Sequence, residues 1–181
     1  MLCYNIFLEM NKWRDDMPVK INVKITEKHI FHFQLYHNYT HLSGIIGTIA
    51  ALGLITLGMI DVINQQVPAS LIWFVCGGML LIFPLQSMKA KAKKQVRSSE
   101  MFQHPLEYEF SEKGVTTRQG ELEVTNEWDK IEKVVQTKKC VIMYMSRVRA
   151  MIFPKECIQE QYDDMMAVIR ANLSPEKVKI K

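Results

Sequence analysis

The stretch LSGIIGTIAALGLITLGMI, residues 42–60, decides how the rest of this sequence folds. Its nineteen residues carry no charge, and a helix that rises about 1.5 Å per residue would make it roughly 28 Å long, close to the hydrocarbon thickness of a bilayer. A second uncharged stretch of the same length, VPASLIWFVCGGMLLIFPL, occupies residues 67–85. Between Lys28 and Lys89 the only acidic or basic residue is Asp61, apart from histidines. The sequence therefore predicts a transmembrane helical hairpin over residues 42–88.

A cationic run follows the second apolar stretch, within a predicted juxtamembrane linker at residues 89–101. The run consists of Lys89, Lys91, Lys93, Lys94 and Arg97. The connector DVINQQ between the two stretches contains no Lys or Arg, and positive charge collects on the cytoplasmic side of membrane proteins. Both termini are therefore expected in the cytoplasm. Anionic lipid of the inner leaflet would attract the run by about 1 kcal/mol per basic side chain.

Two other interpretations of these segments fit less well. A secretory signal peptide would begin near the N-terminus, and a second span would not follow it at once. Nucleic-acid binding would need basic residues spread over a folded face, with aromatic residues or a recognisable motif. The basic residues here are instead concentrated beside an apolar stretch.

The region before the hairpin predicts a strand and a helix. Residues 1–16 join no later pattern and are expected to be an N-terminal extension. Within residues 17–41, the segment KINVKIT at 20–26 alternates apolar and polar residues, which is the period of a half-buried strand. Thr26 then offers an N-cap for an amphipathic helix that begins at Glu27 and lies at the membrane interface. The sequence leaves open whether the strand joins the C-terminal domain.

Histidine and cysteine do not form a recognisable metal site in this sequence. Four of the five histidines lie in the predicted interfacial helix. At 100° per residue, His29 and His32 sit about 80–180° around the axis from the other two, so the four cannot share one ion. The other two are His37 and His41, and the four cysteines are Cys3, Cys76, Cys140 and Cys157. The cysteines show no ligand spacing, so no metal and no cofactor is expected.

Small residues within the two apolar stretches predict where the helices approach each other. They are Ser43, Gly47, Ala51, Gly77 and Gly78. Small side chains allow close approach, so these positions are expected to pack the hairpin on itself, with a seam between copies as the open alternative. Neither stretch contains an acidic or basic residue, which argues against a proton relay or an ion pathway.

Residues 102–173 change to the pattern of a β-rich domain, followed by a tail at residues 174–181. Segments such as LEYEF at 106–110 alternate as strands do, and ECIQEQYDDMMAVIRANL at 156–173 places an apolar stripe on a helix. The predicted fold class is a membrane α-helical hairpin plus an α+β PH-like split barrel, with antiparallel strands capped by one C-terminal helix. The expected core consists of Tyr108, Phe110, Trp128, Ile142, Tyr144, Ile152, Tyr162 and Ile169.

Several quoted segments together point to a known family. They are VKINVKITEKHIFHFQLYHNYTHLSG before the apolar stretches, KAKKQV after them, and YEFSEKGV and NEWDKIEKVVQTKKCVIMYMSRVRAMIFPK in the domain. From about Met17 to its end, the chain resembles the YcxB-like family of small bacterial membrane proteins. The resemblance implies a PH-like cytoplasmic domain behind a transmembrane hairpin in a bacterial plasma membrane. It supplies no established catalytic residues.

The sequence predicts a non-enzymatic interaction or regulatory module at the inner face of that membrane. Its expected partners are anionic inner-leaflet lipid and either another protein or a second copy, and nucleic acid is not expected. The alternative is a subunit of a small homo-oligomeric channel or transporter, in which Asn64, Gln65 and Gln66 would ring the pore mouth. Enzyme activity is not expected. A nucleophilic dyad would need a histidine in the domain, and the only one there is His104, which lies in the linker before the first predicted strand.

Overall fold

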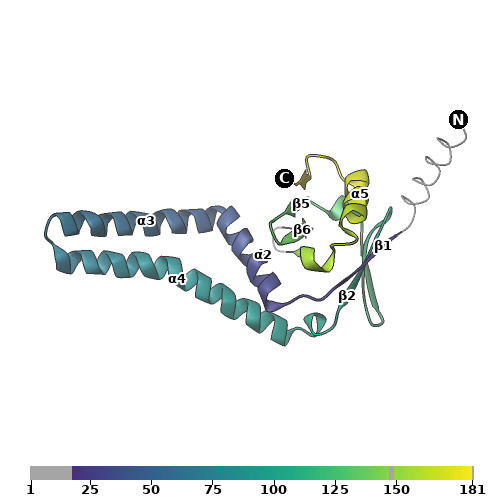
Figure 1. Ribbon diagram of the computed structural model, residues 1–181, viewed down its shortest axis with the longest axis horizontal. Coiled ribbons are helices and arrows are strands. Elements are labelled where there is room, and N and C mark those ends of the chain that lie inside the picture. The colour runs from purple at the N-terminus through teal and green to yellow at the C-terminus, as the bar shows by residue number, and fades with distance from the viewer. Residues whose placement is uncertain (1–17, 147–148, 181) are drawn as a thin grey trace, which may run out of the picture. The chain divides into compact units, whose positions relative to one another are not determined.

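The computed structural model describes residues 18–146 and 149–180 (Figure 1). The chain divides into two compact units. Residues 30–98 form the hairpin unit, and the segments before and after them, 18–29 and 99–180, form the sheet domain. The predicted N-terminal extension, residues 1–16, lies outside the described residues.

The hairpin unit contains the two predicted apolar helices. After α2 (Glu27–Thr40), the chain forms α3 (Leu42–Ile63) and α4 (Val67–Ser98), which run antiparallel side by side and meet at a short turn (Figure 1). Only 11% of the apolar window of each helix is buried within the protein. The core helix of a soluble protein would be mostly buried, so these two helices fit a lipid environment better than an aqueous one. Both are long and apolar enough to cross a membrane.

The cationic run, which the sequence sets apart as a linker, is instead helical. α4 continues past Pro84 without a break and ends at Ser98, so the run forms its last turns. Ala, Lys, Gln and Arg favour helix, and no Gly or Pro follows Pro84 until Pro105. Ala92 is buried, while Lys89, Lys91, Lys93, Lys94 and Arg97 are exposed. The five charges are therefore carried on an extension of the second apolar helix.

Two of the five predicted packing residues lie between α3 and α4. Ala51 and Gly77 are buried, and a Cβ at Gly77 would lie 2.8 Å from Ile55 Cγ1 and 3.0 Å from the Ala51 oxygen. For the other three, the structure shows no such close approach within the hairpin, although Ser43 and Gly47 lie on the same helix stripe as Ala51. Ser43 is exposed, and a Cβ at Gly47 or Gly78 would meet nothing within 4 Å. Gly58, which the small-residue pattern does not single out, also packs closely in the hairpin, where it lies against the Phe74 ring.

Substituting Gly77→Val is expected to loosen the hairpin, whereas Gly78→Val is not. At Gly77 the new side chain overlaps Ile55 and the α3 backbone, and overpacking of this kind costs about 1–3 kcal/mol. Gly78 has open space around it, so it is the matched control for helix propensity. Titrating each variant from mild micelles into SDS, with helical circular dichroism as readout, should give a lower midpoint for Gly77→Val alone. Equal midpoints would contradict this packing.

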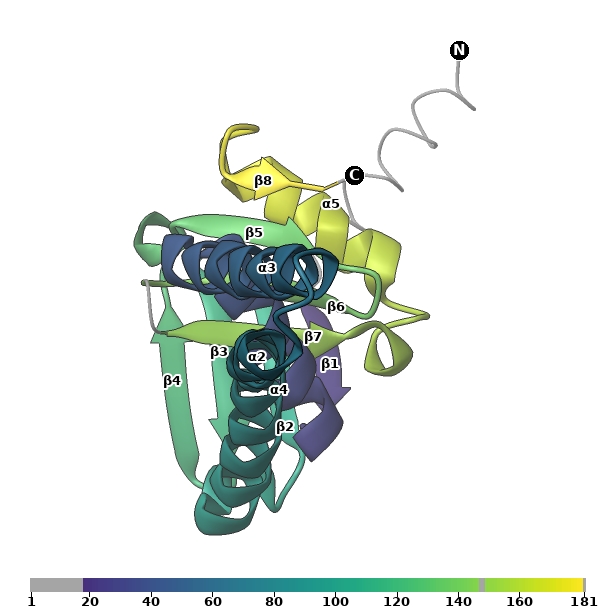
Figure 2. The ribbon, with the colours of Figure 1, turned by 90° about the vertical axis from the view of Figure 1, so that its left-hand side faces the viewer.

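The sheet domain contains two four-stranded sheets, and the N-terminal strand belongs to the first of them. Its strands β1 (Val19–Val23), β2 (Leu106–Ser111), β3 (Gly114–Gln119) and β4 (Leu122–Asn126) pair in that order, all antiparallel. The second sheet has the order β7 (Ala150–Pro154), β6 (Cys140–Tyr144), β5 (Lys133–Gln136) and β8 (Val178–Lys179). Figure 2 shows β4 and β1 at opposite edges of the first sheet. The domain is split-barrel-like, with two sheets and no closed barrel.

The core lies where the sheets face each other. The Phe153 ring of β7 is 4.8 Å from Tyr108 and 5.3 Å from Phe110, measured between ring centroids. Helix α5 (Tyr162–Asn172) adds its buried face, Met165, Met166 and Ile169. Three short 3₁₀ helices complete the elements: η1 (Glu100–Phe102), η2 (Trp128–Lys130) and η3 (Lys155–Cys157).

Most of the predicted core is confirmed, with two exceptions. Tyr108, Phe110, Trp128, Ile142, Tyr144 and Ile169 are buried. Ile152 is only half-buried, because its neighbours Met151 and Phe153 occupy the opposite, more deeply buried face of β7. Tyr162 is also half-buried, and its hydroxyl donates to Gln136 Oε1 at 3.0 Å.

The predicted tail also takes part in the domain. β8 lies within residues 174–181 and pairs with β5 in parallel, which departs from the expected all-antiparallel pattern. Lys177 Nζ donates to the Ile131 oxygen at 2.9 Å and fastens the same segment. The sheet domain therefore extends to Lys179.

Candidate interaction surface

The edge strand β4 of the first sheet is exposed along most of its length. β4 pairs with β3 on one side and is the last strand of its sheet. Leu122 is 72% exposed and Val124 is 58% exposed. An edge strand leaves backbone N–H and C=O groups free to pair with another strand. β4 thus combines an open backbone edge with exposed apolar side chains.

The apolar side chains of β4 lie on the same face of the sheet as the core. Val124 is opposite Thr117, which is opposite Tyr108, and directly opposed residues share a face. Leu122 is opposite Gln119, whose side chain donates to the Met101 oxygen at 2.8 Å. The core face therefore continues across β3 to β4, where it is no longer covered.

Charged side chains occupy the opposite face of the sheet. Arg118 of β3 reaches Glu109 of β2 and also Glu123 of β4, the latter at 3.1 Å. Lys20 of β1 lies 3.8 Å from Glu109. Hydrogen bonds to Glu123 and Glu109 raise the pKa of Arg118, so its charge persists at any physiological pH. This outer face carries alternating charge: positive on β1, negative on β2, positive on β3 and negative on β4.

The far end of β4 is fixed firmly to the domain. The Trp128 Nε1 group donates to the Ser111 oxygen at 2.9 Å, and the hydroxyls of Thr116 and Thr125 lie 2.9 Å apart. Gly114 packs against the backbone of Asn126 so closely that no side chain fits between them. β4 is therefore held in one orientation, which is a requirement for a specific edge.

His29 contributes an anchoring contact that sequence reasoning missed. Its Nδ1 accepts from the backbone N–H of Thr26 at 3.2 Å, so Nε2 carries the proton and donates to Glu156 Oε1 at 2.8 Å. The sequence predicts that Thr26 caps α2 with its side chain, whereas this hydrogen bond runs from the backbone N–H of Thr26 to a residue of the first turn. His29 joins the start of α2 to η3, a role that no local pattern indicates because Glu156 lies 127 residues away.

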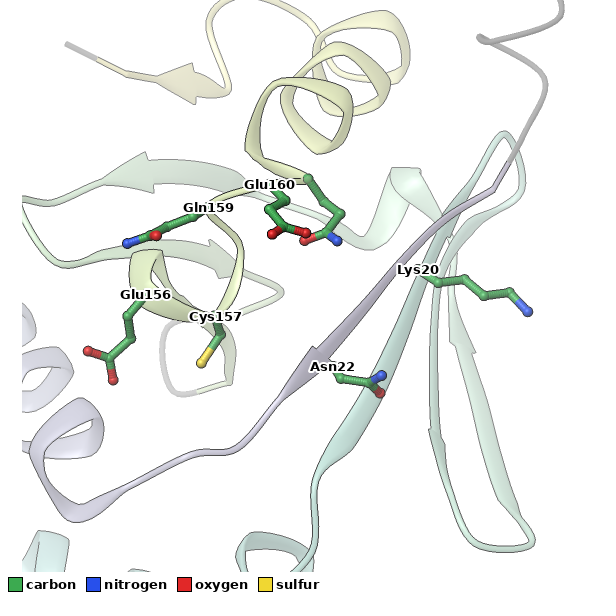
Figure 3. Close-up of a pocket in the computed structure, with 7 residues that line it drawn as sticks. Lys20, Asn22, Glu156, Cys157, Gln159 and Glu160 are labelled. Carbon is green, nitrogen blue, oxygen red and sulfur yellow. The ribbon is translucent and has the colours of Figure 1, made fainter.

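A shallow pocket beside β1 is lined by polar and charged side chains that do not point toward one another. The lining residues are Lys20, Asn22, Glu156, Cys157, Gln159, Glu160 and Gln161. Figure 3 shows that Lys20 and Asn22 point away from Glu156 and Cys157. A nucleophile and a base must lie within hydrogen-bond reach of each other, and this arrangement does not provide that geometry.

Two buried groups have raised pKa values, so both stay protonated near neutral pH. Burial raises the pKa of Cys140 to about 11 and that of Tyr108 to about 12. The thiolate is the reactive form of cysteine, so Cys140 stays an unreactive thiol near neutral pH. Within residues 18–146 and 149–180, no three His, Cys, Asp or Glu side chains gather into a possible metal site.

The cationic run lies on the hairpin unit. Lys89 Nζ is 5.8 Å from the centre of the Phe31 ring of α2, and Gln34 of α2 donates to Gln95 at 3.5 Å. The C-terminal part of α4 is therefore packed beside α2, with its charged ends exposed.

The fold and these surfaces define a class of protein, in which two apolar helices that could cross a membrane are joined to a split-barrel-like domain. Residues 110–169 match the family model of YcxB-like protein, from the end of β2 into α5. This match confirms the resemblance inferred from the sequence over residues 110–169. The comparisons with curated proteins and with solved structures found no significant match.

Proposed function

We propose that this protein is a membrane-anchored, non-enzymatic module that presents its sheet domain to a protein partner at the inner face of a bacterial plasma membrane. The observation that carries the proposal is the open edge at β4, with Leu122 and Val124 exposed, on a domain joined to two apolar helices. The diverging side chains of the pocket beside β1 and the high pKa of Cys140 favour binding over catalysis.

The charge distribution supports an orientation with both termini in the cytoplasm. The turn between α3 and α4 contains no Lys or Arg, whereas the end of α4 carries five exposed positive side chains. These charges also give the protein an attraction to anionic lipid. Asp61, the one acidic residue of the hairpin, accepts a hydrogen bond from Trp73 Nε1 at 2.9 Å.

Cross-linking in intact bacterial membranes tests the proposal. A C-terminally tagged full chain is compared with a tagged chain that ends at Ser98 and so lacks most of the sheet domain. We expect a stoichiometric adduct with one other protein that forms with the full chain and is lost with the shortened one. Adducts between copies alone, retained by the shortened chain, would contradict the proposal and favour a homo-oligomeric channel or transporter.

Cysteine labelling from outside the cell tests the orientation. A single cysteine introduced at Gln65, in the turn between the apolar helices, is expected to react with an impermeant maleimide. A single cysteine at Lys113, in the β2–β3 turn, should react only after lysis. The native cysteines are replaced by serine or alanine in both chains. The reverse pattern would contradict a cytoplasmic sheet domain.

A further inference from the structure

The pairing of β1 with β2 shows what kind of strand this sheet accepts. In β1, apolar residues such as Ile21 and Val23 alternate with polar ones such as Lys20. Their partners on β2 are apolar and acidic in matching positions: Tyr108 for Ile21 and Glu109 for Lys20. Lys20 lies 3.8 Å from Glu109, and Ile21 is only 2% exposed. A strand that alternates apolar residues with Lys20 and the polar Asn22 is thus bound to one that alternates apolar and acidic residues.

β4 repeats the acceptor pattern of β2 but lacks such a neighbour among the described residues. The segment ELEV at residues 121–124 alternates acidic and apolar residues, as does LEYEF at 106–110. On β2 the apolar residues are buried, whereas Leu122 and Val124 are exposed. Across the outer face, charge alternates strand by strand and ends at Glu123 with a negative charge. The next strand in this order would carry positive charge.

The same charges argue against two other occupants. A second copy that paired through its own β4 would bring Glu121 and Glu123 of both chains close together, and like charges on adjacent strands destabilise a sheet. An anionic lipid surface would likewise be repelled by these carboxylates. Either occupant could cover the apolar side chains of β4, but each would place negative charge beside Glu121 and Glu123.

We propose that β4 binds, as a fifth strand of its sheet, an extended segment of a protein partner in which apolar residues alternate with Lys or Arg. The apolar side chains of the partner cover Leu122 and Val124 and extend the core face. Its basic side chains lie beside Glu121 and Glu123 on the outer face, and its backbone pairs with the open edge of β4. This mode of recognition is strand addition, in which backbone hydrogen bonds give affinity and alternate side chains give specificity. The inference rests on the proposed function and names the site and the partner chemistry.

The first test uses peptides and the full chain in lipid nanodiscs of uncharged lipid. The basic probe is PVKINVKIT, the sequence of residues 18–26, and the acidic probe is PVEINVEIT. We expect the protein to bind the basic probe about five- to tenfold more tightly, since exposed cross-strand charge pairs each contribute a modest free energy. A photoreactive residue at position 124 should label the basic probe. Equal binding of the two probes, or labelling from position 20 instead, would overturn the inference.

A charge reversal separates recognition from folding. The double substitution Glu121→Lys and Glu123→Lys is expected to reverse the preference, so that the acidic probe binds more tightly. A misfolded domain would lose both probes instead of exchanging them, and Glu112→Lys, an exposed acid in the β2–β3 turn, is the matched control that should change nothing. An unchanged preference in the double variant would overturn the inference. The inference would also be overturned if the wild-type chain formed dimers and bound neither probe.

The membrane cross-linking experiment distinguishes this inference from the proposed function. If the chain ending at Ser98 loses the partner adduct while the Glu121→Lys, Glu123→Lys variant keeps it, the module binds through another surface and the β4 inference fails alone. If the full chain forms no adduct with another protein, the proposed function fails. Loss of the partner adduct both in the chain ending at Ser98 and in the Glu121→Lys, Glu123→Lys variant supports strand addition at β4.

Discussion

A fragment that contains only residues 99–181 is expected not to fold, although it includes the whole segment matched by the family model. The fragment lacks β1, which pairs with β2 over five residues. Ile21 and Val23 of β1 are 2% and 0% exposed, and burying each such side chain contributes about 1.5–3 kcal/mol. Their loss, together with the unpaired edge of β2, removes a large part of a domain stability that is typically about 5–15 kcal/mol.

A linked variant should restore the fold, because the register brings the ends close. Val23 pairs with Leu106, so a short Gly/Ser linker in place of residues 30–98 connects β1 to β2 and keeps His29 in the domain. We expect this linked domain to unfold cooperatively in urea, and the same domain with Ile21→Asp to behave like the 99–181 fragment. Proton NMR dispersion and the urea midpoint measure both. A well-dispersed, cooperatively unfolding 99–181 fragment would contradict the role given to β1.

The second large effect is expected from Gly114→Ala. Gly114 has a φ of +145°, and a Cβ there would lie 2.2 Å from the Asn126 oxygen. The backbone conformation alone costs a residue with a side chain about 1–3 kcal/mol, and the overlap must also push β3 away from the end of β4. We expect the sheet domain to lose about 3 kcal/mol or more, measured as the shift in urea midpoint by pulse proteolysis of the full chain in micelles.

Gly120→Ala is the matched control for this effect. Gly120 also has a positive φ, +58°, but a Cβ there meets nothing within 4 Å. A left-handed conformation costs about 1–2 kcal/mol in an alanine, so this variant should shift the midpoint much less. If the two alanine variants were equally destabilised, the close approach of Gly114 to Asn126 would carry no energetic weight.

The two units carry surfaces of opposite charge: the end of α4 is basic, and the edge of the sheet domain at β4 is acidic. Lys89, Lys93 and Arg97 recur every four residues on the helix that follows the second apolar stretch. Glu121 and Glu123 lie on the edge of the sheet domain. In the proposed function the first set attracts anionic lipid, and in the further inference the second set selects a basic segment of the partner, so the two surfaces do not compete for the same ligand.

Local sequence pattern was sufficient for the features that depend on neighbours along the chain. Nineteen uncharged residues at 42–60 specify a helix long enough for a bilayer. The alternation in KINVKIT and LEYEF specifies strands, and the buried Phe110 and Tyr108 follow from it. The basic run was also recognised, but its helical state was missed, because charge pattern and helix propensity are separate properties of the same residues.

Only the tertiary structure decided which of these patterns is covered by another element. LEYEF and ELEV have the same alternation, yet Tyr108 is buried beneath Phe153 while Leu122 is open. Gly77 packs against α3 while Gly78, one residue later, does not. β1 joins β2 across the intervening residues 24–105, and β8 pairs in parallel with β5. The physical reason is that alternation fixes which residues share a face, whereas burial depends on what packs against that face, and that contact is made by residues distant in sequence.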